Sequence, residues 1–439
     1  MVLILSEKLS QRLEYTVKYI FKELMGVEFR ITSSRDEFRS FSGAKLVYAS
    51  KNLVPDVPWM YSQGLLNETA LRMDISVNPE IRNGMPVLFP YHEDNMIVPF
   101  DLFSSVFFLV SRYEEYLPFT PDPHGRFEAG SSRLYPSGFF KRPLINEWVN
   151  HLKNILTVIF PEFNPPDQKF GFQLTFDIDS AWAYKNRGVL RSLGGYYNSA
   201  KRLSVNELVD RTLVLTNLRP DPFDTFDYIL NICNQYNTHP VFFILAGKFG
   251  RYNKNIHPEN LVFRNLLKRI VQQGEIGIHP SYESFDDASV YKNEIHILSQ
   301  ITEKAIVKSR QHFLRMRLPD TYRILIREGI TEDYSMGYAG STGFRAGTCS
   351  PFYFYDLPAE TETKLKIFPV SIMEGTLKDY MKLEPDEAIE SVQKVIHQIK
   401  MVNGTFIPLW HNESLSDKGK WKGWRRVFEE MMKLVTCVW

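Results

Sequence analysis

The sequence predicts an α/β fold with a parallel sheet in its larger, C-terminal part, preceded by a smaller α+β domain. From residue 172 onward, short apolar strands alternate with amphipathic helices in about seven successive steps. Such alternation is typical of a parallel sheet, either open or closed into a barrel. A proline-containing segment at 161–167 separates this alternating pattern from the different pattern of the N-terminal part. We therefore expect two domains, at 1–165 and 168–439.

In the N-terminal part, apolar residues recur with helical spacing ahead of Gly26, which favours a helix end. Residues 50–98 are rich in Pro, Asn and Gly and predict loops. Near residue 112 a predicted helix ends in a charged run, Arg112-Tyr113-Glu114-Glu115-Tyr116, which we expect to be exposed ahead of Pro118. The elements expected here are helices at 7–25, 102–116 and 144–159 and strands at 27–32 and 45–48.

In the C-terminal part, glycine residues at 274 and 329 end helical patterns, and an apolar run follows each of them or lies close by. The expected strands lie at 172–178, 241–245, 275–279, 305–313, 331–335, near 366–370 and at 405–410. The expected helices lie at 224–234, 263–273, 289–302, 319–327 and 385–401. In parallel sheets of this kind, chemistry sits at the carboxyl ends of the strands.

Composition excludes several classes of protein. Hydrophobic residues make up 44% of the chain and aromatic residues 14%, which suits large buried cores. The 52 basic and 51 acidic residues leave a net charge of +1, so nucleic acid is not an expected partner. Three scattered cysteines, Cys233, Cys349 and Cys437, predict free thiols. No apolar stretch is long enough for a membrane span, and the N-terminus does not resemble a secretory signal, so we expect a cytoplasmic location.

Two carboxylates lie on one strand, in the segment 174–180. Because side chains alternate along a strand, Thr175, Asp177 and Asp179 share one face, while three apolar side chains share the other. Two anionic groups roughly 7 Å apart are costly in a buried place without a cation or water. The alternative is a strand end at which both acids reach solvent, and the Asp-x-Asp spacing alone leaves the two interpretations equal.

Further polar side chains fall at the ends of other predicted strands. His279 and His411 each end a strand, and Arg310, His312 and Arg315 lie along or just past another. Their convergence would suit metal-assisted hydrolysis. A divalent ion lowers the pKa of water and polarises a carbonyl, and a separate carboxylate takes a proton from that water. A protonated imidazole then supplies the leaving group's proton, and an arginine can hold the base ionised.

With these motifs, residues 168–439 resemble the polysaccharide deacetylase family, the NodB-type carbohydrate esterases of bacteria. Thr175-Phe176-Asp177-Ile178-Asp179, Ile278-His279-Pro280-Ser281-Tyr282 and Leu409-Trp410-His411-Asn412 resemble its motifs. The resemblance implies a distorted (β/α)7 barrel and a divalent metal, with zinc as the expected ion. It implies Asp177 as general base, Asp179 and His279 as metal ligands and His411 as general acid. The implied substrate is an acylated sugar or polysaccharide.

The sequence departs from that family at two points. The family places a second metal-binding His four residues after the first, where this chain has Glu283, so Glu283 is the candidate third ligand. The family's Arg–Pro motif is not plainly present, and Arg310, Arg315 and Arg345 compete to orient the base. We favour Arg345, because Gly343 and Gly347 let its loop approach a site closely.

Two other functions compete with a deacetylase. Loss of the second metal His favours a catalytically weakened descendant that binds carbohydrate or a polysaccharide-synthesis complex. A glycoside hydrolase using Asp177 and Asp179 is the third interpretation, but two acids on one strand do not flank a glycosidic bond as that mechanism requires. Residues 1–165 match none of the motifs, and we expect them to pack against the barrel or to shape the substrate groove.

Overall fold

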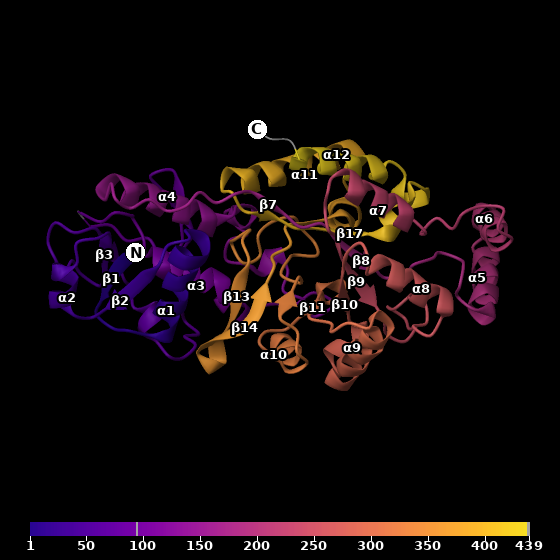
Figure 1. Cartoon of the computed structure of the whole chain (residues 1–439), viewed down its shortest axis with the longest axis horizontal. Helices are drawn as coiled ribbons and strands as arrows, with labels where there is room; N and C mark the ends of the chain where they lie inside the picture. Colours follow the sequence, from indigo (N-terminus) through magenta and orange to yellow (C-terminus); the bar gives the residue numbers. More distant parts are fainter. Residues whose placement is uncertain (94, 437–439) are drawn as a thin grey trace.

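The structure, a computed structural model, describes residues 1–93 and 95–436. The molecule is elongated (Figure 1), with the N-terminal elements at one end and a large sheet in the centre. A hairpin of two helices, α5 (Val189–Lys201) and α6 (Val205–Leu215), forms the opposite end. The carboxyl ends of the central strands position the site described below.

The N-terminal part is built on a four-stranded sheet in which every neighbouring pair is parallel. Its strand order is β2-β1-β3-β4, so the chain crosses over between strands, and the arrangement is α/β and not the α+β expected. The first strand was not predicted, although its five residues are all buried. The elements are β1 (Val2–Ser6), α1 (Gln11–Val17), a π-helix (Lys18–Leu24), β2 (Phe29–Thr32), α2 (Arg35–Ser40), β3 (Lys45–Ala49) and β4 (Trp59–Tyr61).

The helix predicted at 102–116 is shorter and ends differently. Helix α3 (Leu102–Val110) stops because Arg112 adopts a left-handed backbone with φ of 53°, and a 3-10 turn follows. The charged run is buried, contrary to expectation, because its members neutralise one another. Arg112 lies 3.0 Å from Glu114 and 2.8 Å from Glu115. The remaining N-terminal elements are a two-stranded antiparallel pair, β5 (Glu80–Arg82) and β6 (Met85–Val87), and helix α4 (Leu144–Ile159), which has the predicted bounds.

The C-terminal part is organised around a nine-stranded sheet of order β13-β14-β12-β11-β10-β9-β8-β17-β15. All neighbours are parallel except β13, which runs antiparallel to β14 at one edge. No pairing joins β13 to β15 in the described residues, so the sheet is open and does not form the closed barrel expected. The strands are β8 (Thr175–Ile178), β9 (Val241–Leu245), β10 (Glu275–His279), β11 (Lys308–Ser309), β12 (Glu332–Asp333), β13 (Phe352–Asp356), β14 (Thr361–Ile367), β15 (Ile372–Met373) and β17 (Pro408–His411).

Helices flank this sheet on both faces, as the alternating pattern predicts. In Figure 1, α11 and α12 lie along the upper side with α7, and α9 and α10 lie along the lower side. A small parallel pair, β7 (Gly171–Phe172) with β16 (Thr405–Phe406), precedes β8 and β17. The helices are α7 (Phe226–Gln235), α8 (Leu261–Ile270), α9 (Ala288–Thr302), α10 (Asp320–Arg327), α11 (Pro385–Met401) and α12 (Trp424–Thr436).

Two predicted strands are much shorter than expected. The strand expected at 305–313 is paired only over β11, because the chain then leaves the sheet in a turn where Phe313 and Leu314 have positive φ. The strand expected at 331–335 is paired only over β12. Short strands leave the residues that follow them free to enter the site. The pattern also missed the α5–α6 hairpin, β13 and α12.

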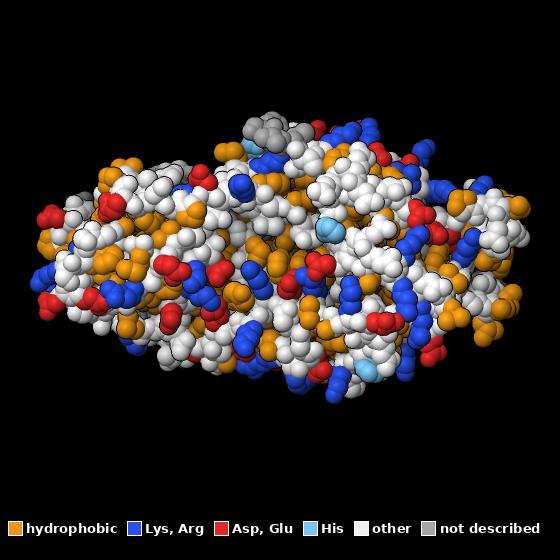
Figure 2. Space-filling view, in the orientation of Figure 1, with side chains coloured by type: hydrophobic (Ala, Val, Ile, Leu, Met, Phe, Trp, Pro, Cys, Tyr) orange, Lys and Arg blue, Asp and Glu red, His pale blue; other side chains and the backbone are white. Residues whose placement is uncertain are grey.

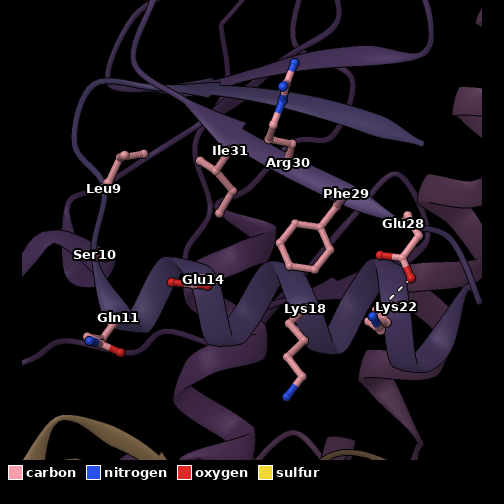
Figure 3. Close-up of a pocket in the computed structure, with 10 residues that line it drawn as sticks. All are labelled: Leu9, Ser10, Gln11, Glu14, Lys18, Lys22, Glu28, Phe29, Arg30 and Ile31. Carbon is pink, nitrogen blue, oxygen red and sulfur yellow. Dashed lines mark ion pairs between the residues drawn. The ribbon is translucent and has the colours of Figure 1, made fainter.

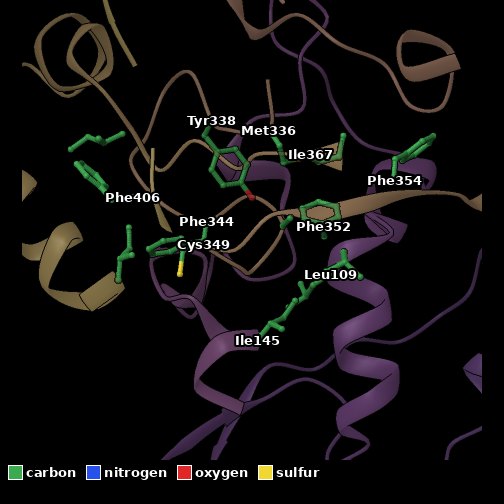
Figure 4. Close-up of a cluster of buried hydrophobic side chains, with 14 of the residues drawn as sticks. Leu109, Ile145, Met336, Tyr338, Phe344, Cys349, Phe352, Phe354, Ile367 and Phe406 are labelled. Carbon is green, nitrogen blue, oxygen red and sulfur yellow. The ribbon is translucent and has the colours of Figure 1, made fainter. Parts of the chain in front are cut away.

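The hydrophobic core runs across the predicted domain boundary. Leu109 of α3 and Ile145 of α4 pack in one buried cluster with Cys349, Phe352 and other residues of the C-terminal part (Figure 4). Buried charges also cross the boundary, since Arg345 lies 2.7 Å from Glu115. Residues 163–170, around the predicted boundary, contain neither helix nor strand. The division into two domains stays a prediction, with an extensive contact between its parts.

Cys233 and Cys349 are buried free thiols, as predicted, while Cys437 lies outside the described residues. Burial raises the pKa of Cys233 to about 11, which makes its thiolate scarce at neutral pH. Within the described part of the chain, no helix has both the length and the apolar character that crossing a bilayer requires.

Candidate functional site

The parallel strands of the central sheet bring polar side chains from distant parts of the sequence to one end. His411, the last residue of β17, is opposite Asp177 of β8, and Ile278 next to His279 is opposite Ser309. Because neighbouring strands point the same way, the residues after each strand meet at one edge. The polar groups gathered there are Asp177, Asp179, His279, Arg310, His312, Glu374 and His411.

A cavity of about 310 Å³ opens at this edge. Four predicted site residues line it together: Asp177, Asp179, His279 and His411. The structure does not bring Glu283 or Arg345 to its lining. Other groups on the wall are His312, Phe313, Met373, Tyr380, Lys420 and Trp421.

Three side chains form a cluster with the dimensions of a metal centre. One ligand atom each from Asp179, His279 and His312 lies within 4.8 Å of the others. Nε2 of His279 is 3.2 Å from Oδ1 of Asp179, and Nε2 of His312 is 3.5 Å from Oδ2. Burial raises the pKa of Asp179, but the neighbouring His312 and His279 outweigh it, so the pKa lies well below its usual value. The carboxylate is therefore ionised and able to ligate.

The hydrogen bonding of this cluster fits a divalent cation. Nδ1 of His279 lies 2.7 Å from the carbonyl oxygen of Arg310, so an Nδ1 proton donated there leaves Nε2 free to ligate. Oδ1 of Asp179 is buried and, in the described part of the chain, has no hydrogen-bond donor aligned with it. A buried carboxylate oxygen without such a donor is costly unless a cation meets it. Two imidazoles and one carboxylate are a donor set typical of zinc with an open position.

Asp177 is held by a buried arginine that follows β11, three strands away in the sheet. Nη1 of Arg310 donates to Oδ1 of Asp177 at 3.0 Å, Nη2 donates to Oγ1 of Thr175 at 2.8 Å, and Nε donates to the carbonyl of Tyr334 at 2.9 Å. Asp177 and Arg310 are 2% and 0% exposed, so water screens neither charge. This contact fixes the orientation of Asp177 and places a positive charge beside its carboxylate.

His411 is held by a second carboxylate that sequence patterns did not identify. Nδ1 of His411 lies 2.7 Å from Oε1 of Glu374, which also accepts the backbone N–H of His411 at 2.9 Å. Burial lowers the pKa of His411, but Glu374 outweighs it and raises the pKa to about 10. His411 is therefore protonated at neutral pH. Its Nε2, 4.0 Å from Oδ2 of Asp179, faces the cavity with a proton to give.

The N-terminal part contributes Arg126 to the lining of the cavity. Arg126 is buried, and its Nη1 donates to the carbonyl of Phe313 at 2.9 Å, while Nη2 donates to the hydroxyl of Tyr380 at 3.3 Å. Phe313 directly follows His312 and has a left-handed backbone. Arg126 therefore braces the turn that presents His312 to the cluster.

Glu283 and the other candidate arginines make different contacts. The Glu283 side chain pairs with the Asn253 amide, and Glu283 is exposed, so it is a solvated neighbour of the loop after β10. Arg345 forms a bidentate pair with buried Glu115, at 2.9 and 2.7 Å, and links the two parts of the chain. Arg315 lies 3.1 Å from Asp286. Arg310 is the arginine in contact with Asp177.

The residues that sequence reasoning missed are His312 as a metal-ligand candidate, Arg310 as the partner of Asp177, and Glu374. Each closely follows a short strand, β11 or β15. The rule that chemistry lies past strand ends would have found them, had the ends been placed correctly. The expected strand at 305–313 instead put Arg310 and His312 inside the sheet.

A larger cavity, of about 710 Å³, lies in the N-terminal part between the first helix and β2 (Figure 3). Its charges are mostly paired: Lys22 lies 3.0 Å from Glu28, and Lys18 lies 2.7 Å from Glu362. None of the described residues that line it is a histidine or cysteine.

Comparison with known proteins gave one family match and several similar structures. A family of unknown function, DUF7033, matches residues 2–161. Comparison with curated proteins gave no match.

Solved structures similar to this chain include several polysaccharide deacetylases. A putative one from Mycobacterium smegmatis is 15% identical, with 61% of this chain and 86% of that chain covered and a TM-score of 0.40. A probable one from Pseudomonas aeruginosa PAO1 is 9% identical, with coverage of 62% and 88% and a TM-score of 0.39. A CE4 family pseudoenzyme from Bacillus anthracis is 12% identical, with coverage of 62% and 62% and a TM-score of 0.29. At such identities and TM-scores, the chemistry of this chain rests on its own side chains.

Proposed function

We propose that this protein is a metal-dependent hydrolase that removes an acetyl group from a sugar or polysaccharide precursor. The observation that carries the proposal is one cavity lined by three kinds of group. They are a carboxylate paired with arginine (Asp177), a carboxylate–imidazole cluster (Asp179, His279 and His312) and a protonated imidazole (His411). Hydrolysis of an amide or ester requires these three functions together.

In this proposal Asp179, His279 and His312 hold the divalent ion. When bound, such an ion would polarise an acyl carbonyl and lower the pKa of a water molecule. Asp177 accepts the proton of the attacking water, and Arg310 holds the Asp177 carboxylate in place. His411 donates its proton to the departing amine or alcohol, and Glu374 holds His411 protonated.

The second imidazole of the cluster, from His312, argues against the alternative of a catalytically weakened binding protein. That alternative rested on Glu283 standing where a metal-binding histidine is expected. His312 supplies an imidazole within 3.5 Å of Asp179 from a different strand. The donor set is complete without Glu283, which favours an active hydrolase.

The decisive experiment measures acetate release and metal content together. Purified full-length protein is loaded with zinc, and N- and O-acetylated sugars and oligosaccharides are supplied as substrates. We expect one divalent ion per chain and release of acetate without new reducing ends. Stoichiometric metal with release of reducing ends but no acetate would support a glycoside hydrolase instead.

Replacing Asp177 with asparagine is expected to lower kcat about 10²–10⁴-fold, the usual contribution of a general base. The amide keeps the shape of the side chain but cannot take a proton. Because Asp177 lies outside the three-residue cluster, the ion should remain bound, which isothermal titration with zinc would show. Equal turnover by wild type and variant on every acetylated sugar tested would remove this role from Asp177.

Replacing Glu374 with glutamine is expected to shift the pH dependence of kcat/KM. Glu374 raises the pKa of His411 to about 10, so the acid form persists to that pH in the wild type. Without the carboxylate charge the pKa falls, and the basic limb of the profile moves to lower pH while the acidic limb stays. An Asp379→Asn variant, which alters another lining carboxylate, is the control. An unchanged basic limb in Glu374→Gln would mean that His411 is not the acid.

A further inference from the structure

A third cavity, of about 540 Å³, lies at the base of the α5–α6 hairpin. Its lining is strongly cationic, with five basic side chains and one carboxylate: Arg187, Arg191, Arg202, Arg211, Lys254 and Glu207. Figure 2 shows Lys and Arg side chains gathered between the body of the molecule and the end formed by this hairpin. Such a concentration of one charge attracts anions.

The guanidinium groups of this cavity are held mostly by neutral partners. Arg187 donates to the carbonyl of Trp182 and the hydroxyl of Ser180, at 2.8 and 3.1 Å from its Nη2. Arg191 donates to two backbone carbonyls, at 2.8 and 3.0 Å. In the described part of the chain, neither forms an ion pair with a carboxylate. Asp221, an acid close enough to affect the charge of Arg187, accepts backbone N–H groups instead.

Arg211 is a buried arginine of this lining whose hydrogen bonding is incomplete. It is 6% exposed, and its Nε is buried without a hydrogen-bond partner among the described residues. Its Nη2 contacts Glu207 at 3.1 Å, and its guanidinium lies over the ring of Tyr184 at 4.7 Å. A Cβ at position 195 would collide with this guanidinium, so Gly195 leaves the space that Arg211 occupies.

The electrostatic state of Arg187 agrees with this excess of positive charge. Burial, together with repulsion from Arg191 and Arg211, lowers its pKa to about 10, against the weaker attraction of Asp221 and Glu413. Burial also lowers the pKa of Arg191. A bound anion would reverse both effects, because an opposite charge stabilises the protonated guanidinium.

Arg187 links the cationic cavity to residues of the catalytic one. The Ser180 hydroxyl that Arg187 contacts belongs to the residue directly after Asp179. Glu413, which lines the catalytic cavity, is close enough to influence the charge of Arg187. A single elongated substrate can therefore place its acyl group at one cavity and an anionic group at the other.

We propose that this cavity binds a phosphate or diphosphate ester, and that the substrate is a sugar carrying such a group. A planar guanidinium group binds two phosphate oxygens at once. A phosphate group therefore fits a cluster of several arginines better than a single carboxylate does. The proposal that the substrate is a phosphorylated sugar rests on the proposed function. The proposal of an anion site does not, and it can be tested without turnover.

The test of the site is binding of inorganic pyrophosphate to the metal-free full-length protein, measured by calorimetry. We expect binding that weakens with added salt, because the interaction is electrostatic. Arg187→Gln and Arg202→Glu, the second at an exposed residue, should each weaken it about tenfold or more. The control Arg317→Gln removes an exposed arginine elsewhere and should change nothing. No binding, or binding equal in wild type and both cavity variants, overturns the proposal.

Two sources of the phosphate are distinguished by parallel measurements. The hairpin exposes large apolar side chains, among them Leu190 at 85% and Leu203 at 86%, so a lipid headgroup is one source. Vesicles of phosphatidic acid in phosphatidylcholine should then bind the wild type and not Arg202→Glu. Binding of a nucleoside diphosphate sugar, without vesicle binding, identifies a soluble ester instead. Failure of both, like failure with pyrophosphate, overturns the site.

The proposal of a phosphorylated substrate is tested by kinetics with matched compounds. A nucleoside diphosphate N-acetylhexosamine should be deacetylated with a lower KM than the unphosphorylated N-acetylhexosamine, and Arg202→Glu should raise only the first KM. Acetate release from both compounds with equal KM overturns the proposal of a phosphorylated substrate. If neither releases acetate while pyrophosphate still binds, the proposed function fails and the anion site stands.

Discussion

Replacing His312 with alanine is expected to remove both the bound divalent ion and acetate release. His312 is 5% exposed and places Nε2 3.5 Å from Asp179, so no water or other side chain substitutes for it without rearrangement. Loss of a group that only supports a ligand typically weakens metal binding about 10–100-fold, and loss of a ligand itself should exceed that. Zinc titration of the purified variant measures the first effect, and acetate assays measure the second.

The matched control is Glu283→Ala, at the position where the sequence alone predicted the third ligand. Glu283 is exposed and contacts Asn253, so its loss should leave zinc affinity and turnover near wild type. The comparison also excludes a general folding defect, since both variants should retain the wild-type circular dichroism spectrum. Reversed behaviour, with zinc lost in Glu283→Ala and kept in His312→Ala, would refute the cluster described here.

The difference between these two residues shows how far local sequence patterns reach. Asp177 and Asp179 are read from one strand, and His279 and His411 from strands whose apolar runs have clear ends. His312 follows a strand of only two paired residues, which alternation cannot locate. The side chain enters the cluster because the chain turns there with two positive φ values. Such a turn is set by tertiary contacts, including the one from Arg126, and not by residues nearby.

The same reasoning explains which parts of the fold the sequence predicted. Long amphipathic helices and fully apolar strands were placed correctly, for example α11 at 385–401 and β9 at 241–245. Closure into a barrel depends on pairing between the two edge strands of the sheet. The spacing of apolar residues along the sequence does not indicate such pairing. The N-terminal crossovers were missed because β1 consists of buried residues without alternation.

Arg345 was favoured as the partner of Asp177 for its flanking glycines, and the structure gives those glycines another role. Gly343 approaches the Phe140 backbone and Gly347 approaches Leu109, both in the N-terminal part. The glycines do allow a close approach, but the loop approaches the N-terminal part of the chain and not the catalytic cavity. Arg345 pairs with Glu115 there.

Replacing Arg310 with methionine is expected to lower the free energy of unfolding by about 3–5 kcal/mol, the usual cost of breaking a buried ion pair. The change leaves the Asp177 carboxylate buried without its partner and removes a donor from Thr175 and from the Tyr334 carbonyl. Denaturant unfolding of the metal-free protein measures the loss.

A double substitution separates this pair from the interfacial one. Because Asp177→Asn removes the charge that Arg310 neutralises, combining it with Arg310→Met should regain part of the lost stability. Arg345→Met should lose a similar amount of stability, because it leaves Glu115 without its partner. Adding Asp177→Asn to Arg345→Met should not restore that stability. If Asp177→Asn restored stability to Arg345→Met and not to Arg310→Met, the charge of Asp177 would be balanced by Arg345 and not by Arg310. The predicted outcome makes Arg310 the residue that balances the charge of Asp177, so the same ion pair stabilises this sheet edge and positions the proposed base.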